Sequence, residues 1–373
     1  MSVETVKLPH LPRIQTLRGV AAVLVLVAHL SQSEARSSPD RVMGDWALWG
    51  FAGVDLFFVI SGFIMVYVTW GSRGGAREAG QFLWRRVSRI YPLYWLVSLP
   101  LFVVWLWRPE VVTGGLYTVD PVRSFLLIPD TGLPLLPVGW TLVYEMYFYL
   151  VFALALLLPG KWRFLVIVAW AVVAQTFEPP GSGPVLELMF SPLVREFLFG
   201  ALIAWVALTT LTVDPILGGD APKSGRSKAV IALVALALLA FGLWTAVGAG
   251  EGAVAVAEDL ALRTEAFGLP AAALVTLALL SPHRASAVGK WLGDISYSLY
   301  LTHVLVLAVM GRFWEMWARD GVWDNLLMLP LIFGASILVG AATYYVVERP
   351  LIRWFRRRRA PRTPAGVSEP ASR

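Results

Sequence analysis

Long apolar segments recur along the whole chain, each close to the length that crosses a bilayer. A membrane-spanning helix needs about 20 mostly apolar residues. Segments of this kind occur near 14–31, 46–70, 91–107, 138–158, 162–177, 188–208, 229–248, 266–281, 291–310 and 326–347. The pattern predicts an all-α, polytopic integral membrane protein with about ten transmembrane helices. No small-residue cleavage site follows Leu30, which favours a retained first helix over a signal peptide.

Composition agrees with a membrane protein and excludes several chemistries. Hydrophobic residues make up 57% of the chain and charged residues only 15%, whereas soluble domains carry about 25% charged residues. The chain has no cysteine, which excludes a thiolate nucleophile and a cysteine metal site. The net charge of +6 is typical of the Lys and Arg excess in cytoplasmic loops, so no nucleic-acid partner is expected.

The basic residues fall mainly in alternate loops. If the N-terminus is cytoplasmic, 23 of the 31 Lys and Arg residues lie on the cytoplasmic side, seven lie outside, and Arg195 falls within or beside the sixth span. This asymmetry predicts an even number of spans with both termini cytoplasmic. The predicted organisation is an N-terminal tail at 1–13, a ten-helix membrane domain at 14–352 and a disordered, basic tail at 353–373 suited to the lipid bilayer surface.

The first span carries an arginine and a histidine on one helical face. Arg18 and His29 are eleven residues apart, which is about 20° past three full helical turns. Snorkelling to the cytoplasmic surface would explain Arg18. His29 lies deeper, toward the outer side, where a titratable side chain is costly. Because histidine is suited to proton transfer near neutral pH, His29 is a candidate general base.

The second span places Asp55 among phenylalanine and valine residues in GVDLFFVISGF. A carboxylate there needs a partner, and His29 or an arginine is the natural candidate. Gly53 and Gly62 indicate a close helix approach or local unwinding. Ser61 has a simpler interpretation, a hydrogen bond back to its own helix.

Two later spans add further polar side chains. In GWTLVYEMYFYL, Glu145 lies between aromatic residues and shares a face with Thr141 and Tyr149. A buried carboxyl group there could act as an acid or base, or orient an imidazole. In GDISYSLYLTH, a serine, a tyrosine and a second histidine share one face. The supporting intramembrane polar residues are Ser61, Trp140, Tyr144, Ser296, Tyr300 and His303.

Three arginines cluster at the cytoplasmic start of the third span. Arg85, Arg86 and Arg89 lie one helical turn apart in LWRRVSRIYPLYW, just ahead of Pro92. Converging guanidinium groups would bind a phosphorylated ligand through charge-assisted, bidentate hydrogen bonds. The alternative is plain anchoring at the membrane surface by the positive-inside rule.

The remaining motifs carry little chemistry. At the end of the tenth span, VVERPL, Glu348 and Arg349 could form a local ion pair, and Pro350 is expected to stop the helix. A nucleotide-binding P-loop, zinc-ligand spacing, a GxSxG elbow and a dinucleotide fingerprint are absent from any usable context. The expected chemistry therefore uses histidine and carboxylates, without a bound metal.

Taken in order, these motifs resemble a known family. The R-x10-H pair, GVDLFFVISGF, RRVSRIYPLYWL, WTLVYEMYFYL, REFLFGALIAW, GDISYSLYLTH and VERP look like the membrane-bound acyltransferase-3 family over about residues 14–352. The resemblance implies an O-acyltransferase of the bacterial cytoplasmic (inner) membrane. It would move an acyl group, usually acetyl, from cytoplasmic acyl-CoA to a hydroxyl of an extracytoplasmic glycan, glycolipid or related metabolite.

The resemblance also implies roles for individual residues. Acetyl-CoA would be a donor substrate, with no permanently bound cofactor. His29 would be the general base or would carry the acyl group itself. The implied catalytic residues are His29, Glu145, Asp55 and Arg18, and the implied acyl-CoA-binding residues are Arg18, Arg85, Arg86 and Arg89. We expect a stand-alone form, without the C-terminal hydrolase-like domain of some members.

Two other classes of function fit part of the pattern. A proton-coupled transporter or flippase could use His29, Asp55, Glu145 and His303 as a proton relay. The lack of a visible inverted repeat and the arginine cluster weigh against it. A polytopic scaffold would use the same residues only for helix packing. For an acyltransferase, acceptor specificity should lie in the outer loops 32–45, 108–137 and 249–265.

Overall fold

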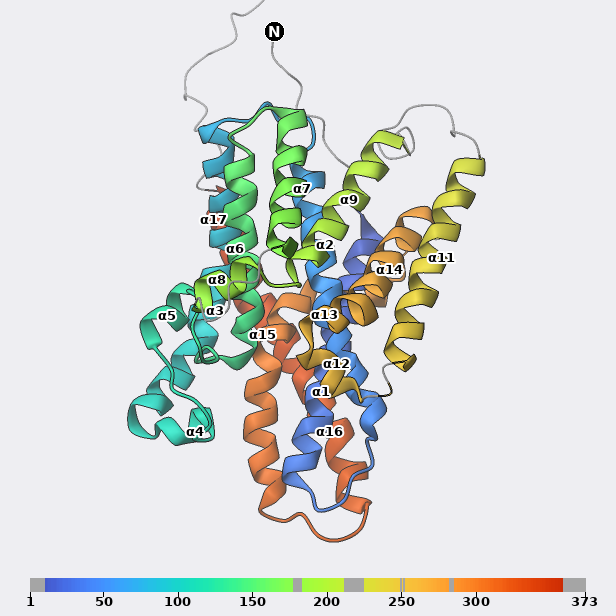
Figure 1. The fold of residues 1–373 in the computed structure, drawn as a ribbon. Coiled ribbons are helices and arrows are strands. Elements are labelled where there is room, and N and C mark those ends of the chain that lie inside the picture. The colour runs from blue at the N-terminus through green and yellow to red at the C-terminus, as the bar shows by residue number, and fades with distance from the viewer. Residues whose placement is uncertain are drawn as a thin grey trace, which may run out of the picture.

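A computed structural model describes residues 11–176, 183–210, 225–248, 250, 252–281 and 285–357. These residues form helices and connecting turns, with no strand among them. Figure 1 shows the helices gathered in one bundle. The predicted disordered tail lies mostly outside the described residues, as does most of the N-terminal tail.

The helices follow the predicted apolar segments closely. They are α1 (Pro12–Ser37), α2 (Ala52–Thr69), α3 (Ala76–Trp107), α4 (Pro109–Thr113), α5 (Pro121–Leu126), α6 (Trp140–Ala155), α7 (Gly160–Thr176), α8 (Pro184–Met189), α9 (Val194–Thr210), α11 (Gly225–Gly248), α12 (Ala253–Glu258), α13 (Leu260–Arg263), α14 (Leu269–Leu280), α15 (Ala287–Glu315), α16 (Trp323–Thr343) and α17 (Arg349–Arg357). Short 3-10 turns at Asp45–Phe51 and Pro137–Gly139 lead into α2 and α6.

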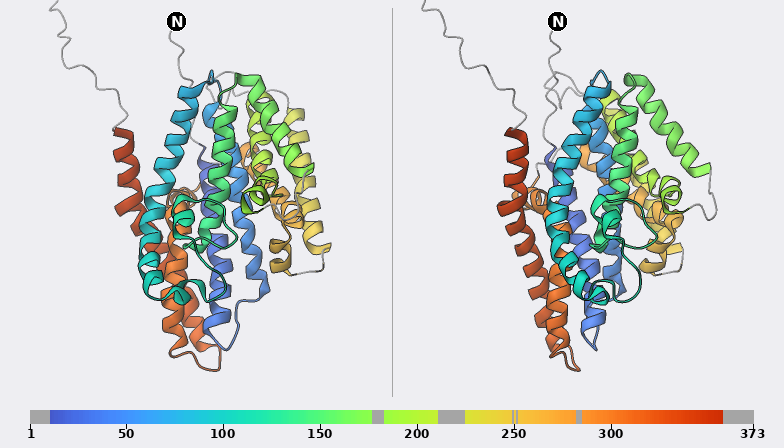
Figure 2. Two further views of the ribbon diagram at one scale, coloured as in Figure 1. Left: turned by 60° about the vertical axis from the view of Figure 1, so that its left-hand side comes forward. Right: turned by 90° about the vertical axis from the view of Figure 1, so that its left-hand side faces the viewer.

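Nine helical segments of the described chain are long and apolar enough to cross a membrane. The remaining predicted span, near 162–177, corresponds to α7, whose 17 described residues would extend about 25 Å, slightly less than a hydrocarbon core of about 30 Å. The prediction of an all-α, polytopic membrane protein is confirmed. In Figure 2, α17 ends at the same end of the bundle from which the chain enters α1.

Glycines allow the central helices to approach closely. The helix α1 packs along α15, and α2 packs along α9. A Cβ atom on Gly62 would overlap the carbonyl oxygen of Phe197, and one on Gly200 would overlap that of Val59. Gly53 meets the carbonyl of Ala21 in the same way. The close helix approach predicted from Gly53 and Gly62 is therefore confirmed.

Prolines lie inside helices at two of the motifs singled out in the sequence. The helix α3 runs through Pro92, and its third and fourth turns carry the arginine cluster. The expected stop at Pro350 is wrong, because a π turn at Tyr344–Glu348 leads directly into α17. A π turn shifts the hydrogen-bond pattern by one residue, which accommodates a residue without an N–H. A second π turn, Thr264–Gly268, precedes Pro270 in the same manner.

Candidate active site

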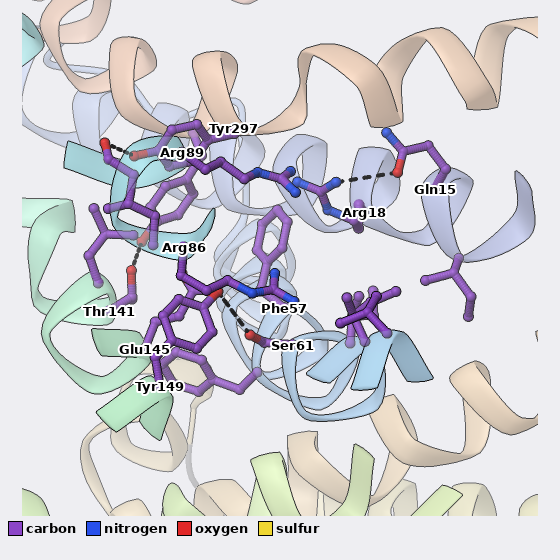
Figure 3. A pocket seen from close by; sticks show the side chains of 18 of the residues that line it. Gln15, Arg18, Phe57, Ser61, Arg86, Arg89, Thr141, Glu145, Tyr149 and Tyr297 are labelled. Atoms are coloured by element: carbon purple, nitrogen blue, oxygen red, sulfur yellow. Dashed lines mark hydrogen bonds between the residues drawn. The ribbon is translucent and has the colours of Figure 1, made fainter. Parts of the chain in front are cut away.

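A cavity of about 740 Å³ lies between α1, α2, α3, α6 and α15. Its volume is within the usual range for small-molecule sites, about 300–1,000 Å³. Hydrophobic side chains form much of the wall. The polar side chains that line it are Gln15, Arg18, Ser61, Tyr67, Arg86, Arg89, Thr141, Glu145, Tyr149, Tyr297 and Tyr300. Figure 3 shows most of them in place.

Three guanidinium groups reach one side of this cavity. Arg18 comes from α1, and Arg86 and Arg89 come from α3, and all three extend into the same space in Figure 3. None of them has a carboxylate within ion-pair distance in the described part of the chain. Among the described residues, Arg18 donates to Gln15 Oε1 alone, at 3.3 Å. Unneutralised cations in a partly buried cavity favour an anionic ligand.

Only two of the three clustered arginines face the arginine-lined cavity. Arg86 and Arg89 line the cavity, whereas Arg85 is exposed and lies outside it. The Arg86 guanidinium lies over the rings of Phe82 and Tyr149, at 5.4 and 5.2 Å from their centroids. The converging trio is therefore formed by Arg18 together with two of the three clustered arginines.

A carboxylate faces the arginines across the cavity. Glu145 Oε1 accepts a hydrogen bond from Ser61 Oγ at 3.0 Å and a short one from the Tyr149 hydroxyl. Ser61 therefore bonds across to α6, and its interpretation as a residue that bonds to its own helix is wrong. Two donors fix the orientation of the Glu145 carboxyl group toward the cavity.

The two intramembrane histidines form a pair. His303 Nε2 lies 3.4 Å from His29 Nδ1. Each Nδ1 atom also lies close to the backbone carbonyl four residues earlier, Val25 for His29 at 3.0 Å and Leu299 for His303 at 3.1 Å. Because a carbonyl only accepts hydrogen bonds, we assign a proton to both Nδ1 atoms. His29 Nδ1–H is then shared with the bare His303 Nε2.

This assignment leaves His29 Nε2 unprotonated. The atom has no hydrogen-bond partner in the described part of the chain. It is also accessible, because it is absent from the set of buried side-chain atoms without a partner, which belong to Ser31, Ser98 and Glu196. His303, in contrast, is fully buried. His29 Nε2 is thus an accessible basic nitrogen in a ring whose orientation His303 and Val25 hold.

The histidine pair lies beside the cavity rather than on its wall. The His303 ring is 6.0 Å from the ring of Tyr300, which does line the cavity together with Phe57. Tyr300 is held by hydrogen bonds to Thr141 Oγ1 at 2.8 Å and to the Val138 carbonyl at 3.0 Å. The Phe57 and Tyr300 rings, 5.7 Å apart, therefore stand between the arginine-lined cavity and the histidines.

Asp55 is paired with an arginine. Of the two partners predicted for this carboxylate, His29 or an arginine, the structure shows the arginine. Arg263 donates to both of its carboxylate oxygens, at 2.8 and 2.9 Å. Both side chains are almost completely buried, and Arg263 also lies over the Trp140 ring. The pair joins α13 to α2 and occupies no part of the arginine-lined cavity.

Breaking this pair should destabilise the protein. In Asp55→Asn, the buried guanidinium of Arg263 would lose its counter-charge, which costs about 3–5 kcal/mol of unfolding free energy. Thermal unfolding of the purified protein would measure the loss. Asp45→Asn breaks an exposed pair with Arg41 and should cost less than about 1 kcal/mol. A stable but inactive Asp55→Asn would instead make this carboxylate catalytic.

A second buried carboxyl group next to this pair escaped the sequence prediction. Glu196 is completely buried, and neither of its oxygens has a hydrogen-bond partner among the described residues. Asp55 and Arg263 both act on it electrostatically. The only sequence signal was its position in the apolar motif REFLFGALIAW.

The other predicted residues are dispersed. Ser296 donates to the Gly293 carbonyl of its own helix at 2.8 Å, while Trp140 and Tyr144 line a different pocket. Glu348 accepts from Ser298 at 2.6 Å, and the predicted ion pair with its neighbouring arginine is not formed in the described chain. Of the four residues of the proposed proton relay, only the two histidines touch, so no continuous relay joins them to the carboxylates.

Comparison with known proteins adds independent evidence. The family model of an acyltransferase domain, acyltransferase 3, matches residues 11–345. The exopolysaccharide production protein ExoZ of Rhizobium meliloti is 32% identical over 339 residues, which cover 86% of this chain and 94% of that protein. The peptidoglycan O-acetyltransferase OatA of Listeria monocytogenes is 24% identical, over 92% of this chain but only 56% of that longer protein. No solved structure matches the chain.

Proposed function

Because the chain belongs to the acyltransferase-3 family and is an acyltransferase, we propose that it O-acetylates a cell-surface polysaccharide with cytoplasmic acetyl-CoA as donor. The protein would work in the bacterial cytoplasmic membrane, with both termini in the cytoplasm. The names of the two relatives, which refer to exopolysaccharide and peptidoglycan, support a polymeric glycan acceptor.

The arginine-lined cavity carries this proposal. Coenzyme A is a polyanion with phosphate groups at one end and the thioester at the other. The cavity offers the guanidinium groups of Arg18, Arg86 and Arg89, which have no carboxylate within ion-pair distance among the described residues and suit phosphate oxygens. Its volume and its mainly apolar wall suit the remainder of such a ligand. The distribution of basic residues in the sequence supports a cytoplasmic position for the arginine end of the bundle, on the side where acyl-CoA is made.

The proposed reaction needs a base on the acceptor side. As the acceptor oxygen attacks the thioester carbonyl, a C–O bond forms, the C–S bond breaks, and the hydroxyl proton passes to His29 Nε2. The proton then returns to the CoA thiolate, which leaves as the thiol. In an alternative order, His29 Nε2 attacks the thioester carbonyl first, so that a C–N bond forms, the C–S bond breaks and CoA leaves as the thiolate. The acceptor oxygen then attacks the acetyl group, a C–O bond forms, the C–N bond breaks, and the hydroxyl proton passes to the thiolate. In both orders Glu145, held by Ser61 and Tyr149, would act from within the arginine-lined cavity, on the donor side of the reaction.

Release of free CoA from labelled acetyl-CoA tests the proposal. The purified protein, reconstituted in lipid vesicles, would be supplied with a surface polysaccharide fraction as acceptor. Label should appear on the polysaccharide in step with free CoA. If the protein neither consumes acetyl-CoA nor binds CoA, the donor assignment is wrong. A pulse without acceptor separates the two orders, because only an acyl-carrying His29 would retain label on the protein.

A further inference from the structure

A second pocket, of about 140 Å³, lies between the loop after α5, the start of α6 and α8. The distribution of basic residues predicts that the loop at 108–137 lies on the outer side of the membrane. The pocket is lined mainly by Asp120, Asp130, Leu133, Trp140, Tyr144 and Glu187. On α6, Trp140 and Tyr144 share one face, and Thr141 and Glu145, which line the arginine-lined cavity, lie about 100° further round the helix. The two cavities therefore lie against adjacent faces of one helix.

The wall of this outer pocket is held rigidly by α3. Three aromatic side chains of α3 donate hydrogen bonds to three consecutive carbonyls at the end of α5. Tyr94 binds the Ser124 carbonyl at 2.9 Å, Trp95 binds that of Phe125 at 2.8 Å, and Tyr91 binds that of Leu126 at 2.8 Å. Ser124 Oγ in turn accepts from the Leu135 amide at 2.8 Å. Such a loop is prepared for a ligand and loses little entropy on binding.

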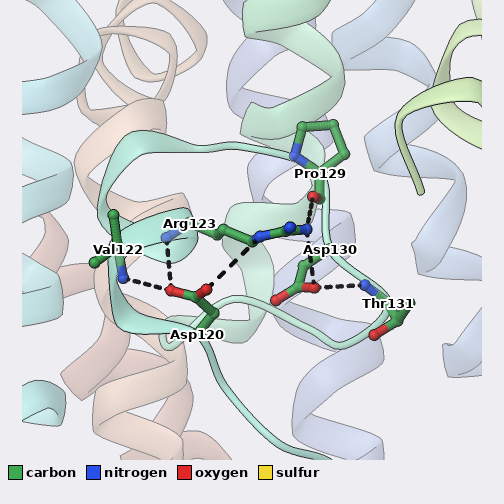
Figure 4. Close-up of polar contacts among 6 residues, drawn as sticks. All are labelled: Asp120, Val122, Arg123, Pro129, Asp130 and Thr131. Carbon is green, nitrogen blue, oxygen red and sulfur yellow. Dashed lines mark hydrogen bonds and ion pairs between the residues drawn. The ribbon is translucent and has the colours of Figure 1, made fainter. Parts of the chain in front are cut away.

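Arg123 ties the two aspartates of the pocket together. Its guanidinium reaches Asp120 Oδ2 at 3.6 Å, Asp130 Oδ1 at 3.4 Å and the Pro129 carbonyl at 3.2 Å (Figure 4). Asp120 Oδ1 is occupied by the amides of Val122 and Arg123. Both aspartates are thus already matched with a cation and with amide donors, and a bound metal is not needed to balance them.

Several polar atoms of the pocket remain available to a ligand in the described part of the chain. The Trp140 indole N–H is a free donor, and the Tyr144 hydroxyl, which lies beside Ser191, can donate or accept. The Glu187 carboxylate and Asp130 Oδ2 are free acceptors. In the described chain, the buried side-chain atoms without a hydrogen-bond partner belong to Ser31, Ser98 and Glu196. The unpartnered atoms of the pocket are therefore accessible to a ligand. Donors and acceptors in one small pocket, beside apolar side chains, match a neutral molecule rich in hydroxyl groups.

We propose that this outer pocket binds one sugar unit of the polysaccharide acceptor, away from the unit that is acetylated. The inference rests on the proposed function and names where the acceptor chain is held. The carboxylates would accept hydrogen bonds from sugar hydroxyls, and Trp140 and Tyr144 would donate to sugar oxygens. A phosphorylated ligand is disfavoured, because the carboxylates of Asp120, Asp130 and Glu187 make the lining acidic.

Binding without any donor tests the inference. The purified protein in lipid nanodiscs would be titrated calorimetrically with oligosaccharides of one to six sugars, released from the surface polysaccharide of the producing cell. Glu187→Gln and Tyr144→Phe should each weaken binding of the longer oligosaccharides about tenfold, the effect of losing one hydrogen bond to a charged or polar group. Acetyl-CoA binding should not change in either variant.

A matched acidic residue outside the pocket provides the control. Glu110 is exposed in the outer loop at 108–137, and among the described residues its carboxylate pairs with Arg108 alone, so Glu110→Gln should bind like the wild type. The inference is overturned if the pocket variants keep wild-type affinity, or if the wild type binds all lengths equally weakly. Failure of the wild type to release CoA would overturn the proposed function instead, because that assay is separate from oligosaccharide binding.

Discussion

Replacing His29 by alanine is expected to lower acetyl transfer about 100- to 10,000-fold, the usual contribution of a general base. The reason is that His29 Nε2 is the accessible, unprotonated nitrogen of the histidine pair. The affinity for CoA should stay near the wild-type value, because His29 does not line the arginine-lined cavity. Initial rates of label transfer, measured beside CoA binding to the same protein, would check both parts.

His303 provides the matched control for this prediction. It accepts from His29 Nδ1 but is itself fully buried, so it acts by positioning. His303→Ala should cost about 10- to 100-fold in rate, as is usual for a residue that orients a catalytic histidine. His303→Gln, which can still accept a hydrogen bond, should recover part of the loss. If His303→Ala lost as much activity as His29→Ala, or if His29→Ala kept substantial activity, the roles assigned to the two residues would be wrong.

The sequence predicted those features that depend on periodicity within one helix. The apolar segments have lengths set by the bilayer, so the long helices were found, whereas the short helices α4, α5, α8, α12, α13 and α17 were not. Arg18 and His29 were expected to share a face, and Glu145 to face Tyr149, because helical geometry fixes which residues of one element are neighbours. The hydrogen bond from the Tyr149 hydroxyl to Glu145 confirms that these two side chains face each other.

Contacts between helices could not be read in this way. Asp55 and Arg263 are 208 residues apart, and only the packing of α13 against α2 decides that this arginine, among many, is the partner. Glu196 was given no role within the predicted span 188–208, and its burial depends on neighbours from other helices. Pro350 was expected to end a helix, because nothing in a local pattern indicates a π turn before it.

The sequence did not show which of the three clustered arginines face the cavity, and the structure identifies Arg86 and Arg89. Arg86→Ala and Arg89→Ala should each raise the KM for acetyl-CoA about 10- to 100-fold, since each removes a charge-assisted hydrogen bond to phosphate. Both guanidinium groups line the arginine-lined cavity without an ion-pair partner in the described chain. Steady-state rates at varied acetyl-CoA concentration would separate this effect from a change in kcat.

Arg85 is the natural control, because it lies beside Arg86 in the sequence and outside the cavity in the structure. Arg85→Ala removes the same charge from the same helix, so it should change the KM for acetyl-CoA less than about threefold, the loss of a screened surface charge. If the three variants raised KM equally, the arginines would act through the summed positive potential of the membrane surface. A selective effect of Arg86 and Arg89 would instead require direct contact, which is what the orientation of α3 predicts.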